Sequence, residues 1–229
     1  GFSRAVQPSD PPPSVLIVSY PSPPTAQWVD LEFYKEIVAL AKKHDMLVLS
    51  DTADSEIYFD DNPPPSLLQV EGAKDIAVEV NSLSKTFAMA GWRVGMVVGN
   101  ERLSAALARV KSYLDYGAYT PIQVAAAAAL NGPTDCIEEI RGIYKARRDT
   151  LVEAMKRAGW DIPAPPASMF AWASLPKAYE EAGSMLFSKL LVEEAGVAVA
   201  PGVAFGEYGE GYVRIGLVEN EHRIRQAAR

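Results

Sequence analysis

The chain has 229 residues, of which 48% are hydrophobic and 22% charged, and its formal net charge is −7. This balance is typical of a globular protein with a packed core and excludes a disordered chain. The acidic charge disfavours nucleic acid and anionic membrane as partners, and no apolar run is long enough to predict a membrane-spanning helix.

Cysteine and histidine are too scarce for a disulfide framework or a metal centre. Cys136 is the single cysteine, and only His44 and His222 accompany it, so neither an internal disulfide nor a zinc site is expected. A lone cysteine fits a reducing, cytoplasmic location. The opening residues Gly1–Arg4 lack the apolar core of a secretory signal and have no initiator methionine, which predicts a fragment of a longer chain.

Short β-branched runs alternate with helical patterns in the first hundred residues. A proline-rich stretch up to Ser14 reads as a connection, and Asp30 is placed to cap a helix that ends near Lys43, with Phe33, Ile37 and Leu40 on one face. The first two apolar runs are expected to be fully buried parallel strands. The predicted strands are 15–19, 46–49, 76–80 and 93–98.

The second half is mostly helical and then changes pattern. Thr120–Gln123 reads as a capping box that opens an alanine-rich helix, and a longer helix is predicted from Asp135 to Ala158. A small α+β unit is expected to follow, with strands at 169–173, 197–200 and 212–217 and a helix at 184–195. The sequence therefore predicts an α/β domain over 1–140, with a mostly parallel sheet and flanking helices, and a small α+β domain over 141–229.

The segment Asn81–Gly95 holds the strongest chemical signal. Lys85 follows a predicted strand, lies next to Ser82 and Ser84, and precedes Arg93. A partly desolvated amine can condense with an aldehyde, and hydroxyls with a guanidinium can bind a dianionic phosphate. The tetrapeptide Ser-Leu-Ser-Lys by itself is more often an exposed loop; the whole segment is much more specific.

This segment resembles the lysine signature of the class I and II aminotransferases, which are pyridoxal-phosphate enzymes of fold type I, and the likeness is greatest to alanine- and aspartate-type members. The resemblance extends over nearly the whole chain and implies the fold and cofactor of that family. Further matching segments are Tyr20–Gln27, Ser50–Tyr58, Lys111–Gly117, Tyr119–Gln123, Pro201–Gly206 and Tyr212–Gly216.

The resemblance implies a role for each matching residue. Lys85 would carry pyridoxal phosphate covalently and then move a proton as a general base, while Asp51 would pair with the ring nitrogen and keep it protonated. Arg214 would bind the substrate α-carboxylate. The phosphate would be bound by Ser82, Ser84 and Arg93.

The same resemblance implies small-molecule partners, an α-amino acid and a 2-oxo acid, and a homodimer. Tyr119 and Thr120 would lie at the subunit interface, although helix capping alone explains Thr120. No metal is expected.

Three features depart from the family pattern. Pro23 stands where the family has asparagine and Asp54 where it has tyrosine, and both usual residues donate to the phenolic oxygen of the cofactor. The N-terminal half of the family's large domain has no counterpart in this chain. We therefore expect weakened catalysis.

Two alternatives stay open. Lysine, aspartate and two arginines also serve a lyase or decarboxylase that uses the same cofactor. Pro23 and Asp54 favour a domain that keeps the fold without catalysis or cofactor, whereas the retained Lys85, Asp51 and Arg93 oppose it.

Overall fold

The computed structural model describes residues 11–229, and its internal contacts divide the chain into two units. Unit 1 comprises Gly1–Pro21, Trp28–Glu56 and Pro63–Ile137, and unit 2 comprises Ser22–Gln27, Ile57–Asn62 and Glu138–Arg229. Most of the predicted N-terminal connection, which runs up to Ser14, lies outside the described residues, and so does all of Gly1–Arg4. We retain the division into domains at residues 140 and 141 as a proposal.

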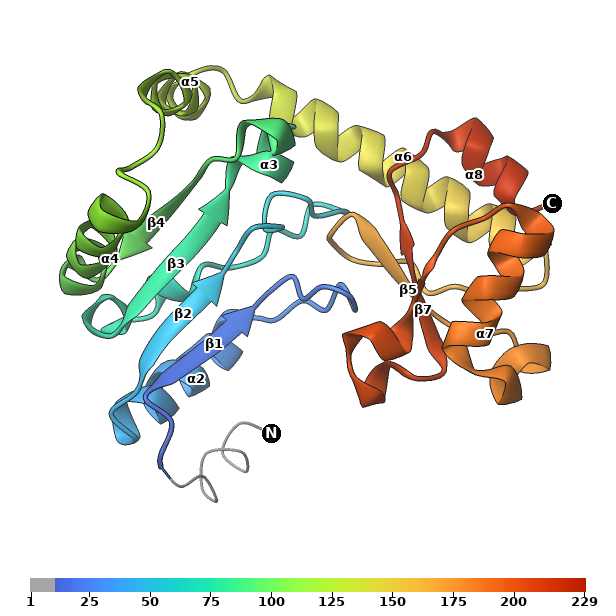
Figure 1. Ribbon diagram of the computed structural model, residues 1–229, viewed down its shortest axis with the longest axis horizontal. Helices are drawn as coiled ribbons and strands as arrows, with labels where there is room; N and C mark the ends of the chain where they lie inside the picture. The colour runs from blue at the N-terminus through green and yellow to red at the C-terminus, as the bar shows by residue number, and fades with distance from the viewer. Residues whose placement is uncertain (1–10) are drawn as a thin grey trace. The chain divides into compact units, whose positions relative to one another are not determined.

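Unit 1 contains a four-stranded sheet in the order β1-β2-β3-β4 (Figure 1). The strands are β1 (Val15–Ser19), β2 (Leu47–Asp51), β3 (Ala77–Ser82) and β4 (Gly95–Gly99). β1, β2 and β3 pair in parallel, and β4 pairs antiparallel with β3. The α/β class and the largely parallel sheet predicted from the sequence are confirmed.

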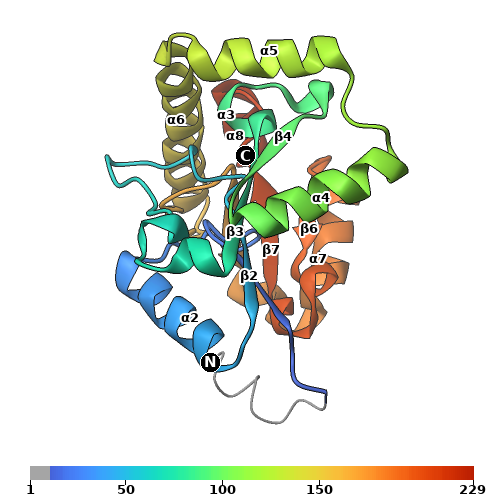
Figure 2. The same ribbon diagram turned by 90° about the vertical axis from the view of Figure 1, so that its left-hand side faces the viewer.

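Helix α2 (Leu31–Lys43) covers one face of β1 and β2 (Figure 2). The backbone N–H of Phe33 donates to Asp30 Oδ1 at 2.9 Å, so the predicted cap is confirmed. The buried face of α2 differs from the predicted one by about one residue. Phe33 and Leu40 are only partly buried and pack against the edge of the core. The buried residues are Tyr34, Ile37, Val38 and Ala41. These helix residues form one core with Val18, Val48 and Ala77.

The prediction that β1 and β2 are fully buried is wrong. Side chains alternate between the two faces of a strand, and only the face bearing Val18 and Val48 meets α2. On the opposite face Ile17 is 65% exposed, and Val15 and Leu47 are exposed as well. A continuous apolar run therefore does not establish that both faces of a strand are covered.

Short helical segments and two longer helices complete unit 1. They are η1 (Leu67–Gln69), η2 (Ala73–Asp75), α3 (Leu83–Thr86), η3 (Ala90–Trp92), α4 (Glu101–Leu114) and α5 (Thr120–Asn131). The predicted capping box at Thr120 is wrong, since Tyr119 is the N-cap and its side chain makes no capping bond. Gln123 Nε2 instead donates to the carbonyl of Ala118 at 2.6 Å.

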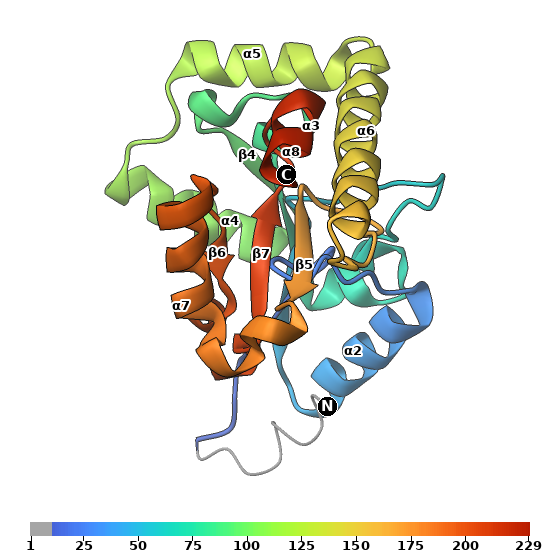
Figure 3. The ribbon, with the colours of Figure 1, turned by 90° about the vertical axis from the view of Figure 1, so that its right-hand side faces the viewer.

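Unit 2 contains a three-stranded antiparallel sheet in the order β5-β7-β6 (Figure 3). Its strands are β5 (Phe170–Ser174), β6 (Ala200–Pro201) and β7 (Tyr212–Gly216). The helices are α6 (Asp135–Arg157, which begins in unit 1), α7 (Gly183–Leu190) and α8 (Glu221–Ala227), with the π-turn η5 (Leu191–Ala195) and the 3₁₀ turns η4 (Lys177–Ala182), η6 (Gly202–Phe205) and η7 (Glu207–Gly209). Of residues 11–229, no helix is both long enough and apolar enough to cross a membrane.

The predicted strand at 197–200 forms only at its end. The backbone N–H of Val197 donates to the carbonyl of Leu191 at 3.0 Å, which closes the turn after η5. Pairing with β7 therefore begins at Ala200, opposite Arg214. The apolar residues before Ala200 indicate a strand, but the backbone N–H of Val197 is bound to the end of η5 and not to a neighbouring strand.

The two faces of the unit 2 sheet differ in composition. Ala171, Ala173 and Val213 are buried in a core that includes Leu151 of α6 and Phe187 of α7. The pairing register puts the alternate side chains on the opposite face. Those residues are Phe170, Trp172, Tyr212 and Arg214.

A buried arginine fixes the segment Ile57–Asn62 to α6 within unit 2. Arg148 is only 5% exposed, and its Nη1 and Nη2 donate to Asp60 at 2.7 and 3.2 Å. The Nζ of Lys145 lies 3.1 Å from the same carboxylate. Hydrogen bonds from Arg148 and then from Lys145 lower the pKa of Asp60 to about 2.

This network predicts an acid-dependent loss of stability. Because the pKa of Asp60 is depressed from 3.8, its contribution is present above pH 4 and is lost as the pH falls through about 2. We expect Asp60→Asn to lower the free energy of unfolding at pH 7 by on the order of 1 kcal/mol, since solvent screens the exposed carboxylate. Chemical denaturation between pH 7 and 2 measures this; an equally steep acid decline in the variant would contradict it.

Candidate cofactor site

The carboxyl end of β2 presents Asp51 beside β3. Asp51 pairs in register with Val80, and the next residue, Thr52, donates its backbone N–H to the Val80 carbonyl at 2.9 Å. The half-buried Asp51 carboxylate accepts the backbone N–H of Ala53 at its Oδ1, at 3.0 Å. The described residues give Oδ2 no hydrogen-bond donor, so this oxygen is left to bind another group.

Lys85 lies in the short helix α3, directly after the carboxyl end of β3 (Figure 1). Ser82 is the N-cap, and its Oγ accepts the backbone N–H of Ser84 at 3.2 Å. Leu83 is buried and anchors the turn, whereas the Lys85 side chain is half-buried. The turn therefore places Lys85 at the carboxyl end of β3.

Arg93 approaches the same turn through the β3–β4 pair. The predicted strand start at Arg93 is wrong, because Arg93 ends η3 in a left-handed conformation with φ 52° and β4 begins at Gly95. The backbone N–H of Leu83 donates to the carbonyl of Val94 at 3.2 Å. A Cβ on Gly95 would lie 2.6 Å from the Asn81 carbonyl, so glycine permits this close approach. The exposed Arg93 guanidinium donates to the Ala90 carbonyl at 2.9 Å.

Asn81 connects the two strand ends, and the sequence analysis missed it. Its Nδ2 donates to the carbonyl of Thr52 at 3.0 Å and lies 3.3 Å from Thr52 Oγ1. This amide joins the residue before Ser82 to the residue after Asp51. The available signal was a polar amide at the end of an apolar strand, where a side-chain bridge to the neighbouring strand is a common use.

Unit 1 thus brings Asp51, Ser82 and Lys85 to the carboxyl ends of the parallel strands β2 and β3. Because β4 runs antiparallel to β3, the segment with Arg93 that precedes β4 lies at the same end of the sheet. Ser84 is in the same turn as Lys85 and is buried. An amine, a carboxylate, two hydroxyls and a guanidinium complement an aldehyde, a basic ring nitrogen and a phosphate. The donor set therefore fits pyridoxal phosphate.

The remaining predicted residues lie partly in unit 2. Arg214 is on β7, with its guanidinium carbon 4.1 Å from the ring centroid of Phe170 and 4.6 Å from that of Phe205. Pro23 lies in the unit 2 segment Ser22–Gln27. The peptide bond between Pro23 and Pro24 is cis. Asp54 is buried in the turn that follows β2 in unit 1.

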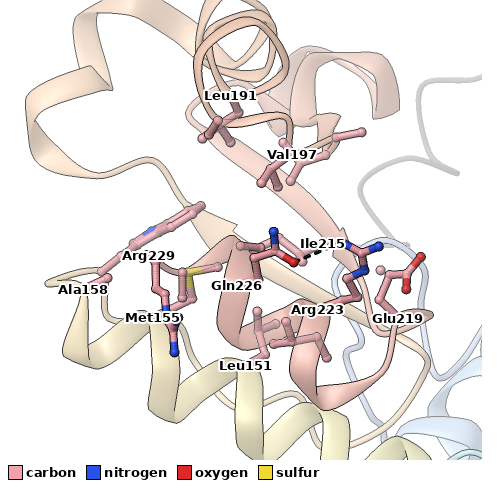
Figure 4. A pocket seen from close by; sticks show the side chains of 18 of the residues that line it. Leu151, Met155, Ala158, Leu191, Val197, Ile215, Glu219, Arg223, Gln226 and Arg229 are labelled. Atoms are coloured by element: carbon pink, nitrogen blue, oxygen red, sulfur yellow. Dashed lines mark hydrogen bonds between the residues drawn. The ribbon is translucent and has the colours of Figure 1, made fainter.

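A separate apolar pocket of about 950 Å³ lies in unit 2 (Figure 4). Leu151 and Met155 of α6, Leu191 of η5 and Ile215 of β7 contribute to its lining, and Arg223 and Glu219 supply charge. None of the predicted site residues lines this pocket. The predicted site residues therefore lie outside this pocket.

Comparisons with known proteins show the family of this chain. Residues 3–229 match the family model described as aminotransferase class I and II. The chain is 65% identical to the putative aminotransferase AatC of Rhizobium meliloti and 52% identical to the glutamate-pyruvate aminotransferase AlaC of Escherichia coli, over 100% of the chain in both cases. It spans 56% and 55% of those two proteins.

A solved aminotransferase structure from Staphylococcus aureus superposes with a TM-score of 0.91 at 32% identity, covering 100% of this chain and 60% of that one. The fold predicted from the sequence is the fold of these structures. The lysine turn, the aspartate at the neighbouring strand end and the match over almost the whole chain lead to one conclusion: this protein belongs to the class I and II aminotransferases.

Proposed function

We propose that the protein moves an amino group between an α-amino acid and a 2-oxo acid, using pyridoxal phosphate bound at Lys85. The observation that carries this proposal is the half-buried Lys85 in the turn after β3, at the same sheet end as Asp51. Relatives named as aminotransferases support it. The chain spans a little over half of the length of these relatives, and the activity of the whole protein is therefore a proposal.

Each residue at the sheet end has a distinct proposed role. Bound pyridoxal phosphate supplies an electron sink that stabilises negative charge at the substrate Cα. The Lys85 Nζ would hold the cofactor covalently and, once released from it, would act first as the base that takes the proton from the substrate Cα and then as the acid that donates it again. Asp51 Oδ2 keeps the ring nitrogen protonated. The phosphate is bound by Ser82, Ser84 and Arg93.

Arg214 is the proposed ligand of the substrate α-carboxylate, because a guanidinium pairs with a carboxylate through two parallel hydrogen bonds. Pyruvate and L-alanine are the natural probes, since one relative is named a glutamate-pyruvate aminotransferase. We propose that the location is cytoplasmic, in keeping with the single Cys136.

We also propose a homodimer. α4 and the connection that follows it expose several large apolar or aromatic side chains to solvent. They are Leu107, Val110, Tyr113, Leu114, Tyr116 and Tyr119. Such a surface is typical of a subunit interface. It includes Tyr119, for which the family resemblance implies an interface position.

A half-reaction separates transamination from a lyase reaction on the same cofactor. The chain loaded with pyridoxal phosphate is mixed with excess L-alanine, and pyruvate and the cofactor absorbance are followed. Transamination gives one pyruvate per site and leaves the amine form of the cofactor, whereas a lyase or decarboxylase restores the starting spectrum. No change in either signal would contradict the proposed function.

Pro23 and Asp54 left a non-catalytic domain open in the sequence, because neither supplies the usual donor to the cofactor oxygen, but the relatives named as aminotransferases do not favour it. If the protein is an enzyme, Asp54→Tyr should raise the single-turnover rate with L-alanine by roughly 10-fold, since a charge-assisted hydrogen bond contributes about 1.5–3 kcal/mol. It should also move the pH midpoint of the cofactor absorbance change downward. Asp61→Tyr, an exposed change in unit 2, is the control. An unchanged midpoint would show that Asp54 does not impair the site.

A further inference from the structure

Arg214 is surrounded by aromatic side chains on the face of the unit 2 sheet opposite its core. In register it pairs with Trp172 on β5, and Phe170 and Tyr212 occupy the same face. Phe205, from η6, joins them through contacts with both Arg214 and Trp172. Two rings thus contact the guanidinium, and two further aromatic side chains lie on the same face of the sheet.

The contacts form a connected set. The Arg214 guanidinium carbon lies 4.1 Å from the Phe170 centroid and 4.6 Å from the Phe205 centroid, both within the range of cation–π attraction. Trp172 packs edge-on against Phe205 at 5.8 Å and stacks on Tyr212 at 5.3 Å with an interplanar angle of 10°. Trp172 and Tyr212 therefore support the ring that contacts Arg214.

This arrangement has a consequence for binding an anion. An arginine side chain has many rotamers, and a ligand that must first fix them binds less tightly. Rings contact the flat faces of a guanidinium and leave its N–H groups, which lie in the plane at its edge, able to donate. Two ring contacts therefore restrict the orientation of the Arg214 guanidinium.

We propose that Phe170 and Phe205 are positioning residues, which hold the Arg214 guanidinium ready for the carboxylate of a 2-oxo acid or amino acid. Trp172 and Tyr212 maintain Phe205 in place. This inference rests on the proposed role of Arg214 as the carboxylate ligand, and it adds the residues that determine how tightly the carboxylate is bound. It does not depend on Lys85 or on the cofactor.

The test compares Phe205→Leu with Phe205→Tyr in the whole chain. Leucine removes the π-face, whereas tyrosine retains it. Phe205 and Tyr179 are both 41% exposed aromatic residues of unit 2, and Tyr179 packs on Phe187, so Tyr179→Leu is the matched control. Pyruvate is the probe. Its dissociation constant is measured by calorimetry, and the Arg214 Nε–H resonance is followed by NMR, assigned by its loss in Arg214→Gln.

Phe205→Leu should weaken pyruvate binding by about 3- to 10-fold, and it should reduce the ring-current shift of the Arg214 Nε–H and speed the rotation of the guanidinium, which keeps only the Phe170 contact. Phe205→Tyr and Tyr179→Leu should change none of these. The proposal is overturned if Phe205→Leu leaves pyruvate affinity unchanged while Arg214→Gln abolishes it, a result that spares the proposed role of Arg214. If Arg214→Gln itself leaves pyruvate affinity unchanged, or the unsubstituted chain shows no saturable binding, the carboxylate role fails and the positioning role fails with it.

Discussion

Replacing Lys85 with alanine is expected to lower the single-turnover rate with L-alanine by on the order of 10⁴. The side chain is proposed both to hold the cofactor and to transfer the Cα proton, and neighbouring residues offer no second amine in the α3 turn, Leu83–Thr86. Stopped-flow absorbance of the chain loaded with pyridoxal phosphate measures this rate.

Lys74→Ala is the matched control for this prediction, because Lys74 is an exposed lysine of unit 1, in η2 and outside the α3 turn. Its rate should equal that of the unsubstituted chain. A Lys85→Ala variant that keeps more than about a tenth of the original rate would mean that another group moves the proton.

Tyr34→Ala should cause the largest loss of stability, about 3–5 kcal/mol in the free energy of unfolding, as for other large aromatic core truncations. Tyr34 of α2 is 1% exposed and belongs to the core beneath β1 and β2. Its loss would loosen the strand that ends at Asp51. Urea denaturation measures the change, and a loss below about 1 kcal/mol would show that the core re-forms around the cavity.

Tyr34→Phe keeps the aromatic ring and removes the hydroxyl, so it distinguishes the contribution of the hydroxyl to stability from that of the ring. Burial raises the pKa of Tyr34 to about 12 from 10.0, so folding favours the neutral form. The stability from this effect is fully present below pH 10 and is lost as the pH rises through about 12, because the unfolded chain ionises first. The variant should therefore lose less stability between pH 10 and 12 than the original chain, measured by urea denaturation at each pH. Parallel declines would contradict the assignment.

Local sequence rules predicted those parts of the fold that depend on neighbouring residues. The Asp30 cap requires only the backbone N–H of Phe33, three residues along. The position of Lys85 directly after a strand follows from the apolar run 76–80, whereas the short helix α3 with Ser82 as its N-cap was not predicted. Both partners of a helix cap lie within a few residues of each other, so a short stretch of sequence can be enough to predict one, as at Asp30.

Other features depend on residues distant in the sequence. Ile17 lies in an apolar run like that of a buried strand, yet its exposure depends on which element covers each face of the sheet. Asn81 bridges to Thr52 across strands that are 29 residues apart. The rings around Arg214 come from β5 and η6, and no local pattern around position 214 indicates them. Tertiary packing decides these features, and propensity alone does not predict them.

The most direct test of the whole account is reduction of the chain with borohydride after incubation with pyridoxal phosphate, followed by mass spectrometry of its peptides. The account predicts one phosphopyridoxyl group per chain, located on Lys85. A chain that is not modified, or one modified on several exposed lysines with Lys85 among the least reactive, would contradict it.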